Sequence, residues 1–211
     1  LVETGGSASL RSLTGSRASS SGSGIAGVIL ARISKAAVEN LERTGITAAR
    51  RGEAAGAVVG TMIGSLGSGG INKAIVNDAV AKITSSAVEN LKASGLTQDQ
   101  ALSAAVASIA KGAVAAVSNI TVEGVESADL SSLAGSVAKS AASSAGSLAS
   151  TPQQAASLSS SAASGAAEGV VKILGDNASI GSDNAASLVR GVVMSATAGS
   201  LDNGWIDPSI N

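Results

Sequence analysis

Two residue types that most often perform chemistry in proteins are missing from this sequence. It contains no histidine and no cysteine, which removes the usual general base, the thiolate nucleophile and the imidazole and thiolate metal ligands. Serine is abundant and lysine is scattered, so no single Ser–Lys pair stands out as a nucleophile with its base. We therefore predict that the protein is not an enzyme and holds no cofactor.

Carboxylates are the remaining candidates for metal binding. The densest acidic group is Glu123, Glu126 and Asp129, in a segment that we expect to be a loop. Clustered carboxylate oxygens can bind Ca²⁺ or Mg²⁺, but three acids in a loop are also what a solvated acidic turn contains. We favour the solvated turn and predict no metal site.

The overall charge argues against several partners. Lys and Arg number 14 and Asp and Glu 15, a formal net charge of −1, so no basic excess is present to neutralise a nucleic-acid backbone. Phe and Tyr are absent, which leaves no aromatic platform for stacking bases or sugars. We therefore expect no nucleic acid and no small-molecule substrate.

The charged fraction points instead to self-association. Only 14% of the residues are charged, against roughly 25% in ordinary domains. A nearly neutral, charge-poor surface promotes association and precipitation. That property suits a structural material, so we expect the main partner to be the protein itself.

One stretch of the chain occurs twice, in residues 31–47 and 81–97. In both copies apolar residues recur every three or four positions, which predicts the buried stripe of an amphipathic helix. Gly45 and Gly95 follow each helix where a C′ residue needs positive φ. The unit is therefore a helix, a glycine turn and a second helix. The matched apolar residues are Leu30, Ile33, Ala37 and Leu41 in the first copy and Val80, Ile83, Ala87 and Leu91 in the second.

Threonines precede the predicted second helices. Thr47 and Thr97 are candidate N-caps, and Gln100 completes a capping box with Thr97. The strongest start is Thr151, followed by Pro152 and Gln154, because Thr favours the N-cap and Pro the first helical position.

These patterns predict an all-α fold, a bundle of about six to seven Ala/Ser/Gly-rich helices built from repeated helix–turn–helix units. The bundle spans residues 25–200. It follows a flexible Gly/Ser-rich lead at 1–24 and precedes a tail at 201–211, where docking of Trp205 stays open. The units are 25–70, 71–120, 127–175 and a partial unit at 180–200.

Glycines repeat along the second helices. Because glycine costs about 1 kcal/mol against alanine inside a helix, such ladders predict that another helix packs very close to them. The same pattern marks helix association in membranes, but Arg50, Arg51 and Glu53 on the first ladder helix favour soluble packing, and we expect no membrane span. The predicted packing or assembly residues are Gly52, Gly56, Gly60, Gly64, Gly112, Gly165 and Gly169.

Several segments resemble the helical domains of spider silk fibroins, the spidroins. Residues 32–41 (RISKAAVENL) and 44–47 (TGIT) are similar to the first helix and turn of their C-terminal domains. Residues 173–175 (ILG), 179–181 (SIG) and 192–195 are similar to the closing segments of that domain. Residues 119–121 (NIT) leading into 130–149 are similar to inner helices of aciniform-type repeats.

The resemblance implies a secreted, extracellular structural protein. It would be stored as soluble helical bundles and converted into fibre by shear, salt and acidification. It also implies that a first-helix cation, Arg32 or its counterpart Lys82, pairs with an acid on a later helix, for which Glu168 is the candidate. The start at Leu1, without an initiator Met, fits a processed secreted protein or an excised domain equally.

Two other classes of function remain open from the sequence. One is a helical filament subunit, pilus-like or capsid-like, whose glycine ladders pack helices between protomers. The other is a membrane-inserting glycine-zipper protein that uses the ladder from Gly52 to Gly64.

Overall fold

The structure is a computed structural model, and it describes residues 20–66, 73–177, 180–202 and 204–205, with side chains from Val28 onward except Ala49. Within these residues the protein is helical and has no strands. The predicted all-α class is therefore confirmed. The expectation of a flexible lead falls mostly on residues 1–19, and that of a tail partly on 206–211, outside the described residues.

Seven α-helices and three short 3₁₀ helices make up the described chain. The first helix begins at Ser20, earlier than the predicted start at residue 25, and it gives way to a 3₁₀ turn at Asn40. The α-helices are α2 (Ser20–Glu39), α3 (Ala48–Gly64), α4 (Lys73–Glu89), α5 (Asp99–Val117), α6 (Leu130–Ser147), α7 (Pro152–Asp176) and α8 (Ser182–Leu201). The 3₁₀ helices are η1 (Asn40–Thr44), η3 (Lys92–Ser94) and η4 (Ser127–Asp129).

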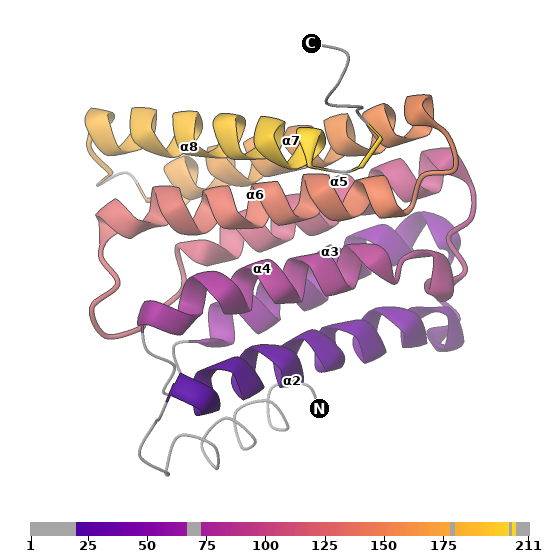
Figure 1. The fold of residues 1–211 in the computed structure, drawn as a ribbon, viewed down its shortest axis with the longest axis horizontal. Coiled ribbons are helices and arrows are strands. Elements are labelled where there is room, and N and C mark those ends of the chain that lie inside the picture. The colour runs from indigo at the N-terminus through magenta and orange to yellow at the C-terminus, as the bar shows by residue number, and fades with distance from the viewer. Residues whose placement is uncertain (1–19, 67–72, 178–179, 203, 206–211) are drawn as a thin grey trace.

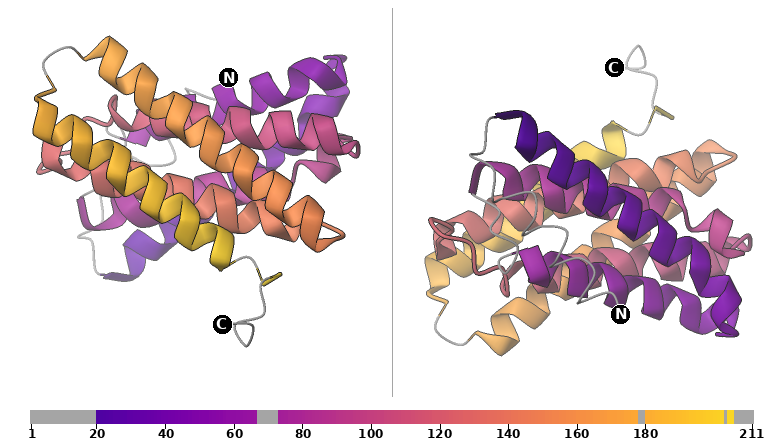
Figure 2. Two further views of the ribbon diagram at one scale, coloured as in Figure 1. Left: turned by 90° about the horizontal axis from the view of Figure 1, so that it is seen from above. Right: turned by 90° about the horizontal axis from the view of Figure 1, so that it is seen from below.

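The helices form two adjoining columns (Figure 1). One column is α2, α4, α6 and α8, which all run in the same direction, and the other is α3, α5 and α7, which run the opposite way. Each helix therefore packs mainly on the helix two places away in the chain, and α6, α7 and α8 also pack on one another. The result is a stack of layers, with α2 at one end, α3 level with α4, α5 level with α6, and α7 beside α8 at the other end (Figures 1 and 2).

The turns that end the first helices of the first two units share one geometry. Gly45 and Gly95 have φ of 73° and 78°, the left-handed conformation that glycine adopts without steric cost. The Arg51 guanidinium links the two turns: Nε donates to the Ile46 carbonyl at 3.0 Å and Nη1 to the Ser94 carbonyl at 2.9 Å. Arg51 thus ties the first layer to the second.

The core combines aliphatic side chains with many alanines. Ile83, Leu91, Leu102 and Ile109 are fully buried, and so are most alanines that face between helices. Serines hydrogen-bond across the helix contacts to backbone carbonyls, and no buried side-chain nitrogen or oxygen in the described residues lacks a partner. These bonds are Ser34 Oγ to Ile83 O at 3.1 Å, Ser86 Oγ to Ala31 O at 2.8 Å, Ser131 Oγ to Ser187 O at 2.8 Å and Ser159 Oγ to Ala142 O at 3.1 Å.

The predicted helix starts have different outcomes. Thr151 caps α7 as expected, and its hydroxyl accepts from the Gln154 N–H at 3.1 Å. Thr47 occupies the N-cap of α3 without a side-chain bond. The capping box at Thr97 is wrong, because Gln98 is the N-cap and α5 begins at Asp99. The Asp99 carboxylate accepts from the Gln154 side-chain N–H at 2.6 Å, which fixes this helix start to the following layer.

The last helix, α8, buries one face, and the chain that follows it is held by a hydrogen bond. Leu188 and Val192 are buried, whereas Val193 on the same helix is 55% exposed. The indole Nε1 of Trp205 donates to the Gly146 carbonyl at 2.9 Å. The chain after α8 therefore docks on the end of α6.

The two threonines provide a test of the capping assignment. We expect Thr151→Ala to lower the free energy of unfolding by about 1 kcal/mol, because the Gln154 N–H loses its acceptor. Thr97→Ala is the matched control and should change stability by less than about 0.5 kcal/mol, as an exposed substitution that removes no cap. Urea denaturation of both variants measures the difference, and equal losses would contradict the assignment.

Candidate functional site

The described residues hold no cluster of three or more acids that could bind a metal. The acidic segment forms local structure instead. Glu126 and Asp129 make a reciprocal capping box around η4, and the Glu126 N–H donates to Asp129 Oδ2 at 2.8 Å. Lys73 Nζ lies 2.8 Å from the same carboxylate oxygen. The candidate site is therefore the set of close helix contacts at the glycines.

The first close contact joins α3 to α5. A Cβ placed on Gly52 would lie 2.8 Å from the Ala105 Cα, and one on Gly60 would lie 3.0 Å from the Gly112 carbonyl oxygen. At Gly56 the added Cβ would collide with the Ser108 carbonyl oxygen. The two backbones touch along these turns, so the first glycine ladder lies against another helix of the same chain.

The second close contact joins α5 to α7. A Cβ on Gly165 would collide with the Ala107 carbonyl, and one on Gly169 would lie 2.7 Å from the Val114 Cβ. On its other side α5 meets α3, where a Cβ on Gly112 would collide with the Gly56 carbonyl oxygen. Gly64 differs from the other predicted packing glycines, since its nearest neighbour is the Asn119 Cβ at an ordinary 3.7 Å.

A third close contact, between α6 and α8, was not predicted from the sequence. A Cβ on Gly135 would lie 2.7 Å from the Ser195 Oγ, while one on Gly191 would collide with the Ser131 hydroxyl and one on Gly199 with the Lys139 carbonyl. The two glycines of α8 are eight residues apart, which returns them to the same helix face after two turns. That spacing of the two glycines in the sequence could have predicted the close contact of α8 with another helix.

A shallow groove of about 770 Å³ runs across α3, α5 and α7 beside the glycine contacts. Small residues form most of its lining, among them Gly56, Gly60, Gly64, Ser108 and Gly112. Charged side chains lie at its edges. The arrangement can hold helices at backbone distance.

The ion pairs correct an expectation that came with the family resemblance. Glu168 pairs with Lys111, with 2.8 Å between Oε2 and Nζ, and not with Arg32 or Lys82. Lys82 pairs with Asp78 on its own helix at 2.8 Å. The reason is the topology: α7 packs on α5 and α6, while Arg32 lies exposed on α2 at the opposite end of the stack. Lys111, the partner that the sequence did not indicate, lies on α5, on which α7 packs.

In the part of the chain that the structure describes, one helix meets the length and hydropathy needed to cross a membrane. It is α5, Asp99–Val117, and half of it is buried inside the protein. Its faces contact α3 and α7 through the glycines described above. Its apolar character therefore has a sufficient explanation in the core of the stack.

No protein-family model matches the chain, and a search of curated proteins gives no match either.

The glycine contacts can be tested by adding a single methyl group. Gly56→Ala should destabilise the protein, since about 1–3 kcal/mol of overpacking outweighs a gain of up to about 1 kcal/mol in helix propensity. Gly175→Ala is the matched control, because no atom lies within 4 Å of its added Cβ, and it should be neutral or slightly stabilising. Thermal unfolding followed by circular dichroism compares them, and equal effects would contradict the close contact.

The start of α6 should respond to acid. The Glu126 N–H and the Lys73 side chain, both bonded to the Asp129 carboxylate, hold its pKa below the ordinary 3.8. A lowered folded-state pKa contributes stability above the unfolded value, and this is lost as pH falls through the folded one. Asp129→Asn should therefore be less stable than the wild type at pH 7, with a difference that shrinks below about pH 4. Urea midpoints at several pH values measure this, with Glu123→Gln as control, and a constant difference down to pH 2.5 would contradict it.

Proposed function

We propose that the protein is a secreted structural protein that assembles with itself, a silk-like fibre component stored as a soluble helical bundle. The observation that carries the proposal is the way the helices are held. Three helix contacts bring backbone against glycine, where a side chain would collide. The composition agrees, with few charges and no histidine, cysteine, phenylalanine or tyrosine.

The proposal includes an architecture of repeated helix–turn–helix units, at 25–70, 71–120 and 127–175, with a partial fourth. The two copies of the repeated stretch start fifty residues apart, at 31 and 81. Cross-layer hydrogen bonds keep nearly the same period: Ser34 and Ile83 are separated by 49 residues, and Ser86 and Ala31 by 55. The units would then follow one another along the stack, each in contact mainly with its neighbours.

Conversion to fibre needs a bundle that can open. Small residues bury little apolar area, and stabilisation scales at about 25 cal/mol per Å². Between Ser140 and Ala167 the chain carries no charge, so the opened segment has no repulsion to prevent stacking of strands. We infer that α6 and α7 supply much of the material that repacks.

The titratable side chains indicate which conditions would trigger conversion to fibre. Histidine is the side chain that ordinarily titrates near pH 6.5, and the sequence has none. The lowered pKa of Asp129 responds only in stronger acid. We therefore propose that shear and salt, rather than mild acidification, drive conversion.

The other two classes fit the contacts less well. A filament that packs its protomers through the glycine ladders would need glycines free for another copy, and Gly52, Gly56 and Gly60 already face α5. A membrane-inserting glycine zipper would use the same helix face. Both alternatives therefore require the α3–α5 contact to open first.

The test is conversion of the full chain under flow. Far-UV circular dichroism and infrared spectra are recorded with light scattering, before and after shear in phosphate at pH 7 and at falling pH. We expect a helical solution that gives β-rich fibres. Assembly with the helical spectrum intact would overturn the silk-like function in favour of a helical filament, and helix-preserving insertion into lipid vesicles would favour the membrane class.

A further inference from the structure

Two stretches of the sequence match the triplet Asn-x-Ser/Thr that accepts an N-linked glycan. They are residues 119–121 (NIT), after α5, and 177–179 (NAS), after α7. Because α5 and α7 run in the same direction, both stretches follow the same end of one column of helices (Figure 1). The triplet alone does not distinguish an acceptor from a chance match, so the surroundings of each asparagine decide.

The stretch after α5 is anchored with its acceptor groups outward. Ile120 and Val122 are 8% and 6% exposed and belong to the core, whereas Asn119, Thr121 and Glu123 are exposed. This alternation puts successive side chains on opposite sides of the chain, as in extended backbone. The amide and the hydroxyl that define the triplet therefore share the solvent-facing side.

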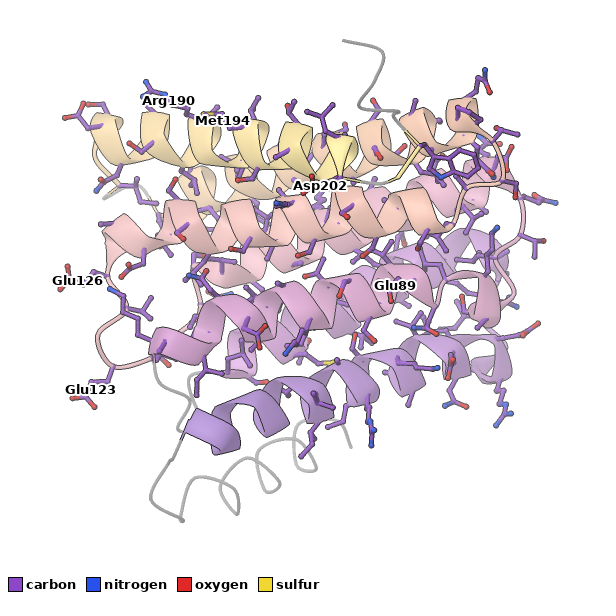
Figure 3. The ribbon with its side chains drawn as sticks, viewed as in Figure 1. Glu89, Glu123, Glu126, Arg190, Met194 and Asp202 are labelled. Atoms are coloured by element: carbon purple, nitrogen blue, oxygen red, sulfur yellow. The ribbon has the colours of Figure 1, made fainter. Side chains whose placement is uncertain are left out.

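The Asn119 side chain can take a substituent. Its backbone N–H donates to the Ala116 carbonyl at 3.0 Å, which fixes the turn, while its side-chain amide has no hydrogen-bond partner among the described residues. Figure 3 shows Glu123 and Glu126 projecting from the loop that follows, at the edge of the molecule. A large hydrated group on Asn119 would thus extend into solvent without displacing a contact.

The asparagine after α7 is placed differently. Asn177 is the C-cap of the helix and is half-buried, and its Nδ2 donates to the Ile173 carbonyl at 3.0 Å. That bond satisfies one of the last carbonyls of the helix. A glycan on Nδ2 would replace one of its two N–H groups and crowd the helix end. Residues 178–179 lie outside the described residues. Of the two asparagines, Asn119 is therefore the better acceptor.

We propose that Asn119 is an N-glycosylation site. In the transfer, Asn119 Nδ2 forms a bond to C1 of the first sugar of a lipid-pyrophosphate-linked oligosaccharide. The C1–O bond breaks, its electron pair leaves with the pyrophosphate, and Nδ2 gives up one proton. The proposal rests on the secretion proposed above, because this modification belongs to chains that enter the secretory pathway.

The glycan would lie at one end of the groove across α3, α5 and α7. Asn119 lines this groove, and its Cβ is the nearest neighbour of a Cβ placed on Gly64, at 3.7 Å. A glycan is bulky and solubilising. On a chain with few charges, it supplies a hydrated layer beside the small-residue groove. It would therefore oppose association of the stored helical form.

The test is secretion of the full chain from cultured mammalian cells behind a cleavable signal peptide, followed by peptide mass spectrometry. We expect an oligosaccharide on the peptide that contains Asn119, removed by peptide N-glycosidase F with aspartate left in its place. Thr121→Val should abolish the modification and Thr121→Ser should retain it, because only the second keeps the hydroxyl. Asn177→Gln is the matched control and should leave the modification of Asn119 unchanged.

Asn119→Gln is a second variant that removes the acceptor, and it should behave like Thr121→Val. Circular dichroism checks that each variant remains helical, so that loss of the glycan is not the result of misfolding. A secreted chain without an oligosaccharide at Asn119, or with one at Asn177 only, would overturn the proposal.

The protective role has its own measurement. Under the same shear, secreted Thr121→Val should show a shorter lag before light scattering rises than secreted Thr121→Ser. The same two variants made in bacteria, without the glycan, should not differ. Equal lags for the secreted pair would overturn the protective role.

These results are separable from the proposed function. If Asn119 carries the glycan and shear never gives β-rich fibres, the modification site stands and the silk-like function is wrong. If β-rich fibres form from a secreted chain that is unmodified at Asn119, the site is wrong and the silk-like function stands.

Discussion

Direct contact between helix backbones is the constraint on which this structure depends. At Gly56 the carbonyl of Ser108 occupies the space of a Cβ, and at Gly112 the carbonyl of Gly56 does the same. The contact is reciprocal, so neither helix can move outward to make room without separating the pair. Since α5 contacts both α3 and α7 in this way, its position sets the spacing of one column. The layers that carry the remaining helices follow from that spacing.

Close approach also changes what serine does in the interior. At ordinary helix separations a serine hydroxyl in a helix usually bonds within its own helix. Here several serines reach a carbonyl of the neighbouring helix, as Ser34 does to Ile83 and Ser159 to Ala142. These bonds take over part of the specificity that large interlocking side chains give in other cores. The sequence can therefore be rich in glycine, alanine and serine and still define one arrangement of helices.

The sequence predicted the helices better than it predicted their contacts. Periodicity located the helices, and the left-handed glycines at 45 and 95 were recognised because both copies of the repeat place them after an amphipathic helix. The helix start at Asp99 was missed because its carboxylate is held by Gln154, more than fifty residues away, and local capping chemistry does not include such a partner. Glu168 was paired with Arg32 from the resemblance alone. Its actual partner, Lys111, follows from the column order, which spacing along the chain does not specify.

A stack with mainly neighbour contacts also links storage to conversion. The inner layers are held on both sides, whereas the end layers are held on one, so the ends are where local opening costs least. The end layers are α2 on one side and α7 and α8 on the other. A force along the stack would therefore separate these helices before the inner ones. In this scheme shear opens the stack layer by layer, so the helical store and the strand-rich product are connected by the stepwise loss of helix contacts.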